Sequence, residues 1–546
     1  MLDVLYTNGK FYTQDSKRPV VSSLAAHGGK IVGVDEQLDP RLFKHVVNLG
    51  GAPVVPGFND AHCHMSHIGE MSLQVDLRPS VVQSMDELLS AIDVAAAATP
   101  DNEWVIGAGY DQNFLGDRHP TAEQLDAVSH GHPVYLVHAS RHMGVANTKA
   151  FELAGYPQRY NVPIPEGGAV PMDAEGRALG LLQETARSVV YDYVPGKDVE
   201  DVARLVSAGS HELLSLGVTS ITEPGLGAPD HIGMSRYDVA GYQLAKDRGQ
   251  LGVRSTVMPY LTTLHPLDDT NVEGHKLYTL DLGLRSGMGD DFMRIGPVKV
   301  LSDGSLIGRS AFMCCDYDVD KGNRGYLQFP EQTLRERLIG AHLAGWQLAM
   351  HAIGDAALDV IMDIVAEAQR LMPRPNARHR IEHASMSSDR QIARMVELGL
   401  VAVPQGRFIH ELGEGVRSAV GAQRQPLAYR AKGFLEAGMI IPGSTDAPVV
   451  SADPILNIDA LVNRMTNSGM PFTESERLTV AEAIYAYTVG SAYAVHEEAY
   501  KGKLAPGYLA DFVVLSQDLY HIPSEDIART KVLATVVGGE VAYGVL

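Results

Sequence analysis

The segment Val54-Val-Pro-Gly-Phe-Asn-Asp-Ala-His-Cys-His64 joins a short apolar run to two histidines that are two residues apart. In an extended strand, alternate residues point to the same face, so both imidazoles could reach one metal ion from the carboxyl end of the strand. The alternative is a pair of histidines that are packed or hydrogen-bonded at a strand end. Cys63 would point away from both rings, and we interpret it as a packed small residue and not as a nucleophile.

Beyond this segment, short apolar runs alternate with helical segments. The runs predict buried strands at residues 217–222, 295–301, 346–351, 380–383, 400–403 and 439–443. Helices are expected at residues 201–216, 355–371, 388–398 and 427–437, and capping-box patterns that begin at Ser84 and Thr333 open two more. Buried parallel strands that alternate with helices indicate a (β/α) barrel or an open doubly wound sheet.

Both ends of the chain are rich in β-prone runs. Residues 4–34 and 510–543 combine such runs with turn signals such as Asn8-Gly9 and Gly538-Gly539. Because neither end alone holds enough strands to close a core, we expect residues 1–56 and 497–546 to form one composite β-sandwich. The barrel would then span residues 57–496, with a substrate-side insertion after its first strand at about 66–200.

Composition argues against several classes of protein. The 546 residues carry a formal net charge of −21, which disfavours binding to nucleic acid or to an anionic membrane. Three cysteines are too few for a disulfide framework, and no apolar stretch approaches the length of a membrane span. We therefore expect a cytoplasmic protein that acts on a small molecule, and the sequence leaves a homo-oligomer such as a dimer open.

Side chains that could ligate a metal stand at the ends of further predicted strands. These residues are Lys299, His351, His383 and Asp446. In a barrel, the carboxyl ends of the strands surround one axis, and barrel active sites lie there. This arrangement favours a metal site over the interpretation of His62 and His64 as two packed histidines.

Other motifs follow one another along almost the whole chain. Besides the segment that ends at His64, they include Ala108-Gly-Tyr-Asp111, His142-Met-Gly-Val-Ala-Asn147, Asp303-Gly-Ser305, His351-Ala-Ile-Gly-Asp355, Arg380-Ile-Glu-His383 and Gly443-Ser-Thr-Asp-Ala-Pro448. In this combination the chain resembles the amidohydrolase superfamily, specifically amidohydrolase family 3 and its branch of YtcJ-like and N-substituted-formamide-deformylase-like proteins. The resemblance implies an α/β fold, a (β/α)8 TIM-like barrel with an insertion after the first strand and a small β-sandwich formed from both termini.

The resemblance also implies a role for each ligand-type residue. His62 and His64 would hold one divalent ion. His351 and His383 would hold a second ion or share the first. Asp446 would contact the first ion and act as the catalytic acid and base, because it can take a proton from the attacking water and return it to the leaving amine. Zinc is the expected metal, with iron, manganese or nickel as alternatives, and one or two ions would bind.

Lys299 is the unusual member of this ligand set. A protonated ammonium would repel a metal ion, whereas a lysine carbamylated by CO₂ offers two oxygens and a negative charge that can bridge two ions. We therefore expect a CO₂-derived carbamate on Lys299. The alternative is an ordinary lysine that pairs with Asp303.

Four further residues are predicted to contact the substrate: Asp303, His142, Tyr110 and Gln405. A structural role is the alternative for each of them, for example an ordinary Asp-Gly turn at Asp303. Gln405 lies where the chain departs from the family pattern, because Gly406 stands where proline is usual. The resemblance therefore predicts the substrate less well than the metal site.

Together, these residues predict a metal-dependent hydrolase that uses a metal-activated water to cleave a non-peptide C–N bond in a small molecule. Linear amides, including N-substituted formamides, are favoured as substrates. A deaminase or a cyclic-amide hydrolase on the same scaffold is the first alternative, and a catalytically silent metal-binding protein is the second. The sequence contains neither a phosphate-binding Walker loop nor the nucleophile elbow of serine hydrolases.

Overall fold

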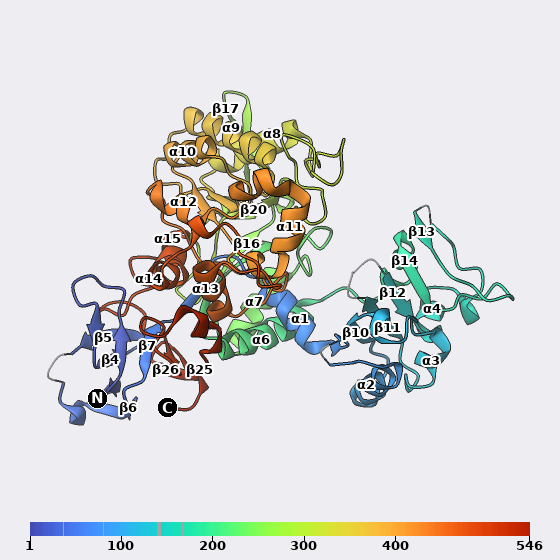
Figure 1. Cartoon of the computed structure of the whole chain (residues 1–546), viewed down its shortest axis with the longest axis horizontal. Coiled ribbons are helices and arrows are strands. Elements are labelled where there is room, and N and C mark those ends of the chain that lie inside the picture. The colour runs from blue at the N-terminus through green and yellow to red at the C-terminus, as the bar shows by residue number, and fades with distance from the viewer. Residues whose placement is uncertain (36–37, 80, 139–142, 166) are drawn as a thin grey trace. The chain divides into compact units, whose positions relative to one another are not determined.

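The computed structural model describes residues 1–35, 38–79, 81–138, 143–165 and 167–546 (Figure 1). The chain divides into two compact units. Unit 1 consists of Met1–Ser66 together with Asp198–Leu546, and unit 2 consists of His67–Lys197. Among the described residues, no helix has both the length and the apolar character needed to cross a bilayer.

Both ends of the chain contribute strands to one sheet of unit 1. This six-stranded sheet has the order β26-β25-β24-β7-β2-β3, and a four-stranded sheet has the order β5-β4-β1-β6. The strands are β1 (Leu2–Thr7), β2 (Lys10–Tyr12), β3 (Val20–Val21), β4 (Leu24–His27), β5 (Lys30–Val34), β6 (Phe43–Asn48), β7 (Pro53–Pro56), β24 (Phe512–Leu515), β25 (Val532–Val537) and β26 (Glu540–Gly544). Apolar side chains of both sheets, such as Tyr6 and Phe512, meet in one hydrophobic cluster, so the two ends of the chain depend on each other for a core.

The larger part of unit 1 is built from parallel strands that alternate with helices, as in a TIM-barrel-like α/β fold. One four-stranded sheet has the order β19-β16-β15-β8 and a second has the order β20-β21-β22-β23. Their strands are β8 (Phe58–Asp60), β15 (Val218–Leu226), β16 (Arg254–Pro259), β19 (Met293–Ile295), β20 (Val298–Leu301), β21 (Leu348–Ala352), β22 (Arg380–His383) and β23 (Val401–Val403). Strands such as β15 and β22 are buried along their whole length, which is typical of parallel sheets that are covered on both faces.

The expected closed barrel appears as two sheets with short junctions between them. Only Gly296 and Pro297 separate β19 from β20, and proline has no N–H for a sheet hydrogen bond. On the other side, a single parallel bridge joins Gln405 to Ser444, and the amide of Ala61 donates to Gly443 O at 2.9 Å. In the part of the chain that the structure describes, no continuous eight-stranded sheet is formed.

The helices of this region cover the parallel strands, and several match the sequence prediction. They are α6 (Val199–Ser215), α7 (Asp238–Asp247), α8 (Glu331–Leu343), α9 (Asp355–Leu371), α10 (Asp389–Glu397), α11 (Phe408–Arg424), α12 (Ala431–Glu436), α13 (Pro454–Asn463), α14 (Val480–Tyr485) and α15 (Ser491–Tyr493), and a hairpin of β17 (His265–Val272) and β18 (His275–Thr279) lies between α7 and α8 in the chain. The bounds predicted for α9 are confirmed, because its buried side chains recur with the helical period and form one apolar face.

Two local predictions were wrong. The helix expected to open with a capping box at Thr333 begins at Glu331, with Pro330 at the N-cap position, so Thr333 lies inside the first turn and does not cap the helix. Residues 439–443 form no strand, and only Ser444 makes a bridge. Pro442 lacks the N–H that a strand would need at this position.

Unit 2 is a mixed α/β unit with one six-stranded sheet of order β13-β14-β12-β11-β10-β9. Its elements are α1 (Met65–Leu73), which begins at the end of Met1–Ser66, β9 (Val75–Asp76), α2 (Met85–Ala98), β10 (Val105–Tyr110), α3 (Ala122–Asp126), β11 (Val134–His138), β12 (Met143–Ala146), α4 (Thr148–Leu153), β13 (Gly168–Ala169), β14 (Leu181–Glu184) and α5 (Ser188–Tyr191). One half of the capping box predicted for α2 is confirmed, because the amide of Glu87 donates to Ser84 Oγ at 3.2 Å, whereas the carboxylate of Glu87 accepts the amide of Gln83 at 2.7 Å.

Candidate metal centre

Three side chains that could ligate a metal converge just beyond the carboxyl end of β8. One ligand atom from each of His62, His64 and Asp446 lies within 4.8 Å of the other two. Oδ1 of Asp446 is 3.3 Å from Nε2 of His62 and 3.1 Å from Nε2 of His64. Imidazole nitrogens and a carboxylate oxygen are typical ligands of zinc and related divalent ions, so this donor set fits such an ion.

The sequence predicted that His62 and His64 lie in a strand, and this prediction was wrong. β8 ends at Asp60, where the chain begins to pair with the segment that carries Asp446, although the amide of Cys63 still donates to Thr222 O of β15 at 3.1 Å. The amide of Asp446 donates to His62 O at 2.7 Å, and the amide of His64 donates to Ala447 O at 2.8 Å. Main-chain pairing between two segments that are far apart in the sequence therefore positions the three ligand side chains.

Asp60 connects the same two segments through its side chain. Its carboxylate accepts hydrogen bonds from the amide of His62 at 3.0 Å and from the amide and hydroxyl of Thr445 at 3.1 Å and 2.5 Å. Burial is the main cause that raises the pKa of Asp60 to about 7. No role was predicted for Asp60 from the sequence, although a carboxylate close after the apolar run at 54–58 is a visible signal.

Glu382 orients the ring of His62. Its Oε2 contacts Nδ1 of His62, which leaves Nε2 to face Asp446. Arg380 donates to both oxygens of Glu382, at 2.8 Å from Nε and 2.9 Å from Nη2, and all three side chains are buried. Burial alone would raise the pKa of Glu382, but Arg380, His62 and Lys299 lower it below its usual value. An ionised carboxylate beside Nδ1 favours the tautomer in which Nε2 can ligate a metal.

Lys299 reaches the same place from β20. Its Nζ lies 3.5 Å from Nε2 of His62, and burial lowers the pKa of the amine to about 8 even though Glu382 and Asp446 act in the opposite direction. Among the described residues, no ion pair joins Lys299 to Asp303. The carboxylate of Asp303 instead accepts the amides of Ile353 at 3.1 Å and Gly354 at 2.8 Å.

His351 and His383 approach from β21 and β22. Their ring centroids are 4.5 Å apart, and the ring of His383 is 5.1 Å from that of His62. Nδ1 of His383 is 2.8 Å from Oε1 of Gln405, and Nε2 of His351 is 3.2 Å from Oδ1 of Asp303. Each ring thus has one nitrogen held by a polar neighbour, which is common for histidines that ligate metals.

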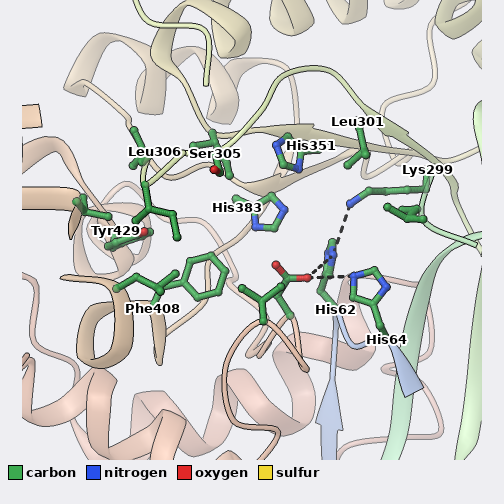
Figure 2. Close-up of a pocket in the computed structure, with 17 residues that line it drawn as sticks. His62, His64, Lys299, Leu301, Ser305, Leu306, His351, His383, Phe408 and Tyr429 are labelled. Carbon is green, nitrogen blue, oxygen red and sulfur yellow. Dashed lines mark hydrogen bonds and ion pairs between the residues drawn. The ribbon is translucent and has the colours of Figure 1, made fainter. Parts of the chain in front are cut away.

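One cavity of about 240 Å³ contains all of the predicted ligands in its wall (Figure 2). These are His62, His64, Lys299, His351, His383 and Asp446. The remaining wall consists of Ile232, Leu301, Ser305, Leu306, Ile307, Ile353, Phe408, Leu412, Val416, Tyr429 and Val449. Figure 2 shows the ligand-type side chains on one side of the cavity, and Leu306, Phe408 and Tyr429 on the other. The cavity therefore joins a metal-binding end to a largely apolar end.

Three of the four residues predicted to contact the substrate have other visible roles. Asp303 contacts the ring of His351, and Gln405 contacts the ring of His383, so both residues position predicted metal ligands. Tyr110 is completely buried in a hydrophobic cluster of unit 2, with its hydroxyl 3.0 Å from Nδ1 of His119. His142 lies outside the described residues. Substrate contact by these four residues stays a prediction.

Cys63 agrees with its interpretation as a packed residue. Cys63 lies between His62 and His64 in the sequence, and its side chain is completely buried. Burial raises the pKa of its thiol well above the usual value. A buried thiol that is hard to ionise is a poor nucleophile.

Comparisons with known proteins agree with this geometry. The sequence model of the amidohydrolase family matches residues 45–543. The protein YtcJ of Bacillus subtilis (strain 168) is 30% identical over 91% of this chain and 90% of its own length. N-substituted formamide deformylase of Arthrobacter pascens is 26% identical over 100% of this chain and 98% of its own length.

A solved structure shows the same arrangement of the chain. The uncharacterized metal-dependent hydrolase of Pyrococcus horikoshii OT3 matches 96% of this chain and 99% of its own, with a TM-score of 0.76 and 27% sequence identity. The family model extends over far more than half of the residues, and the relatives match nearly full length. The chain therefore belongs to the amidohydrolase family, a family of metal-dependent hydrolases with a TIM-barrel-like α/β fold.

Proposed function

We propose that this protein is a metal-dependent hydrolase that cleaves a non-peptide C–N bond in a small molecule, with a linear amide or an N-substituted formamide as the favoured substrate. The observation that carries the proposal is the convergence of His62, His64 and Asp446 at one end of a cavity with an apolar opposite wall. The similarity to an N-substituted formamide deformylase supports the choice of bond.

The donor set would hold one or two divalent ions, for which we propose zinc. His62, His64 and Asp446 would bind the first ion, and His351 and His383 would bind a second ion or share the first. When bound there, a divalent ion would supply a water of lowered pKa and would polarise the substrate carbonyl.

Asp446 would move the proton during hydrolysis. Burial alone would raise the pKa of Asp446, but contacts with His62, His64 and His383 lower it well below its usual value, so the side chain is a carboxylate. The carboxylate would take one proton as the water oxygen bonds to the carbonyl carbon, and would give that proton to the nitrogen as the C–N bond breaks. An acid product and an amine result.

We further propose that Lys299 carries a carbamate. The ammonium would first lose one proton, and the neutral amine nitrogen would then attack the carbon of CO₂, forming an N–C bond and releasing a second proton, so that an anion replaces a cation. The position of Nζ at 3.5 Å from a metal-ligating nitrogen supports this proposal, because a fixed positive charge there would oppose metal binding.

An amide panel combined with elemental analysis tests the function. The purified protein should contain a stoichiometric divalent metal and hydrolyse a linear amide. Activity should fall on chelation and return when the metal is added back. A ring-opened acid from a cyclic amide, or ammonia from an amine substrate, would instead identify the cyclic-amide hydrolase or the deaminase. Full activity in a metal-free preparation would contradict the proposal.

The remaining expectations on architecture and setting are also proposals. Residues 1–56 and 497–546 would form a β-sandwich, residues 57–496 would close a (β/α)8 barrel, and residues from about 66 to 200 would be an insertion after the first barrel strand. The sheet that combines β2, β7 and β24 supports the first of these. We also propose a cytoplasmic location, assembly as a homodimer, and no association with nucleic acid or membranes, in keeping with the net charge of −21.

A further inference from the structure

One face of α11 forms much of the apolar wall of the cavity. Phe408, Leu412 and Val416 follow one another at intervals of four residues, so they lie on the same face of the helix. Leu301, at the end of β20, and Leu306, in the segment after it, add further apolar surface. A substrate bound at the metal ligands would therefore place its remaining atoms against hydrocarbon.

This apolar end offers no charge to a substrate. Of the described residues that line it, Ser305 and Tyr429 are the polar ones, and both are neutral. The hydroxyl of Ser305 already accepts the amide of Gly308 at 3.0 Å. The arginines next to Phe408 and Val416 in the sequence have other partners. Arg407 pairs with Glu411 at 2.8 Å, and Arg417 donates to Pro471 O at 2.7 Å. A carboxylate placed here would lose its hydration without gaining a counter-charge.

Two apolar residues of the wall remain exposed to solvent. The exposed fractions of Ile307 and Val449 are 49% and 56%. Ile307 approaches α11 at Gly415, where an added Cβ would lie 3.1 Å from Cγ2 of Ile307, so the glycine permits a close approach. Exposed apolar side chains that continue into a cavity are typical of a site that binds an apolar ligand.

We infer that the substrate carries one compact, uncharged apolar group beside its scissile bond, and that the α11 face formed by Phe408, Leu412 and Val416 selects this group. The inference rests on the proposed function, because it takes the metal-binding end as the place of bond cleavage. The cavity volume of about 240 Å³ lies just below the range of ordinary ligand pockets, so the apolar group is small.

Two matched pairs of amides test this selectivity. On the nitrogen side, N-butylformamide is compared with N-(3-carboxypropyl)formamide. On the acyl side, N-methylpentanamide is compared with N-methylglutaramate. In each pair the reacting amide and the chain length are the same, and only the terminal methyl or carboxylate differs. We expect the apolar member of at least one pair to have a kcat/KM higher by about tenfold or more, and each buried methylene to contribute roughly fourfold.

Leu412 offers a variant that should change the preference. Leu412 is half-buried in the wall, so an arginine there can keep its charge near the solvent. Leu412→Arg should raise kcat/KM for a carboxylate substrate relative to its apolar partner by about tenfold. Leu412→Gln is the matched control, because it adds polarity without charge and should not favour the carboxylate. Val416→Ala is a milder second variant that should shift the preferred chain length upward by about one methylene.

The outcomes separate the inference from the proposed function. Hydrolysis of the carboxylate members at rates equal to or above those of the apolar members would overturn the inference and leave the function standing. If the metal-loaded protein hydrolyses none of the four amides, the proposed function fails, and calorimetric titration of the same compounds decides the inference. Tighter binding of the apolar members would then support it, whereas equal or weaker binding would overturn it.

Discussion

Replacing Glu382 with glutamine tests whether this carboxylate orients a metal ligand. Glu382 contacts Nδ1 of His62, and Nε2 of the same ring faces Asp446. Glutamine keeps the size of the side chain and one carbonyl oxygen, but it lacks the negative charge that favours a proton on Nδ1. The expected result is weaker metal binding by a site whose ligands are all still present.

Two effects of known magnitude are expected for this variant. Loss of the partner that orients a ligating histidine typically weakens metal affinity by about 10- to 100-fold, which corresponds to roughly 1.4–2.8 kcal/mol. Arg380 would also lose its buried counter-charge, at a cost of about 3–5 kcal/mol of unfolding free energy. Arg380 retains its hydrogen bond to Ala61 O at 2.6 Å, so we expect the lower part of that range.

A matched control separates metal binding from stability. Glu497 is also buried, and it pairs with Lys501 at 2.6 Å and with Arg294 at 3.3 Å, away from the residues that line the cavity. Metal affinity would be measured by competition with a chromophoric chelator, and the unfolding free energy of the metal-free protein by urea titration. Glu382→Gln and Glu497→Gln should both lose stability, but only Glu382→Gln should lose metal affinity. Unchanged metal affinity in Glu382→Gln would refute the orienting role.

Three further predictions concern Asp446, Lys299 and Asp238. Asp446→Asn should lower kcat by about 10²-fold or more with an unchanged circular dichroism spectrum, because the amide cannot take the proton; near-normal turnover would contradict the catalytic role. Lys299→Ala should lose bound metal and activity, and an added short carboxylic acid should partly restore both. The mass of the intact, metal-loaded wild-type protein should include one CO₂, and a mass spectrum without this adduct would contradict the carbamate. Burial raises the pKa of Asp238 from 3.8 to about 6 in the folded state, so its favourable contribution is complete below its unfolded pKa and is lost as the pH rises through the folded pKa. Between about pH 4 and pH 7 the unfolding free energy of the wild type should therefore fall by about 2 kcal/mol relative to Asp238→Asn, and parallel pH curves from urea titrations would contradict this.

The places of His351 and His383 in the fold could be predicted, because each residue has a local signature in the sequence. His351 and His383 come at the ends of apolar runs, and the observed strands β21 and β22 agree with those runs to within two residues. α9 was predicted to its terminal residues, since an apolar face with the helical period specifies a helix wherever the helix packs. In such segments, local pattern and tertiary burial favour the same structure.

The residues that hold the ligands could not be predicted in the same way. The contact between Glu382 and His62 joins positions that are 320 residues apart, and nothing near Glu382 in the sequence indicates its partner. Asp60 likewise acquires its role only when Thr445 is brought beside it. The capping box expected at Thr333 is a different case. The helix begins at Glu331, earlier than the local pattern suggested, so Thr333 lies inside its first turn.

The two pairs of histidines differ in what positions them. His62 and His64 share main-chain hydrogen bonds with the segment of Asp446, and Asp60 adds side-chain hydrogen bonds between the same segments. The separation of these three ligands is thus set by the backbone before any ion binds, which is the condition for a preorganised site. His351 and His383 belong to the other parallel sheet. The ring of His351 contacts the side chain of Asp303 and the carbonyl of Gly304, and the ring of His383 contacts the side chain of Gln405. This difference argues that His62, His64 and Asp446 form the more rigid part of the centre, and that the histidines of β21 and β22 complete it.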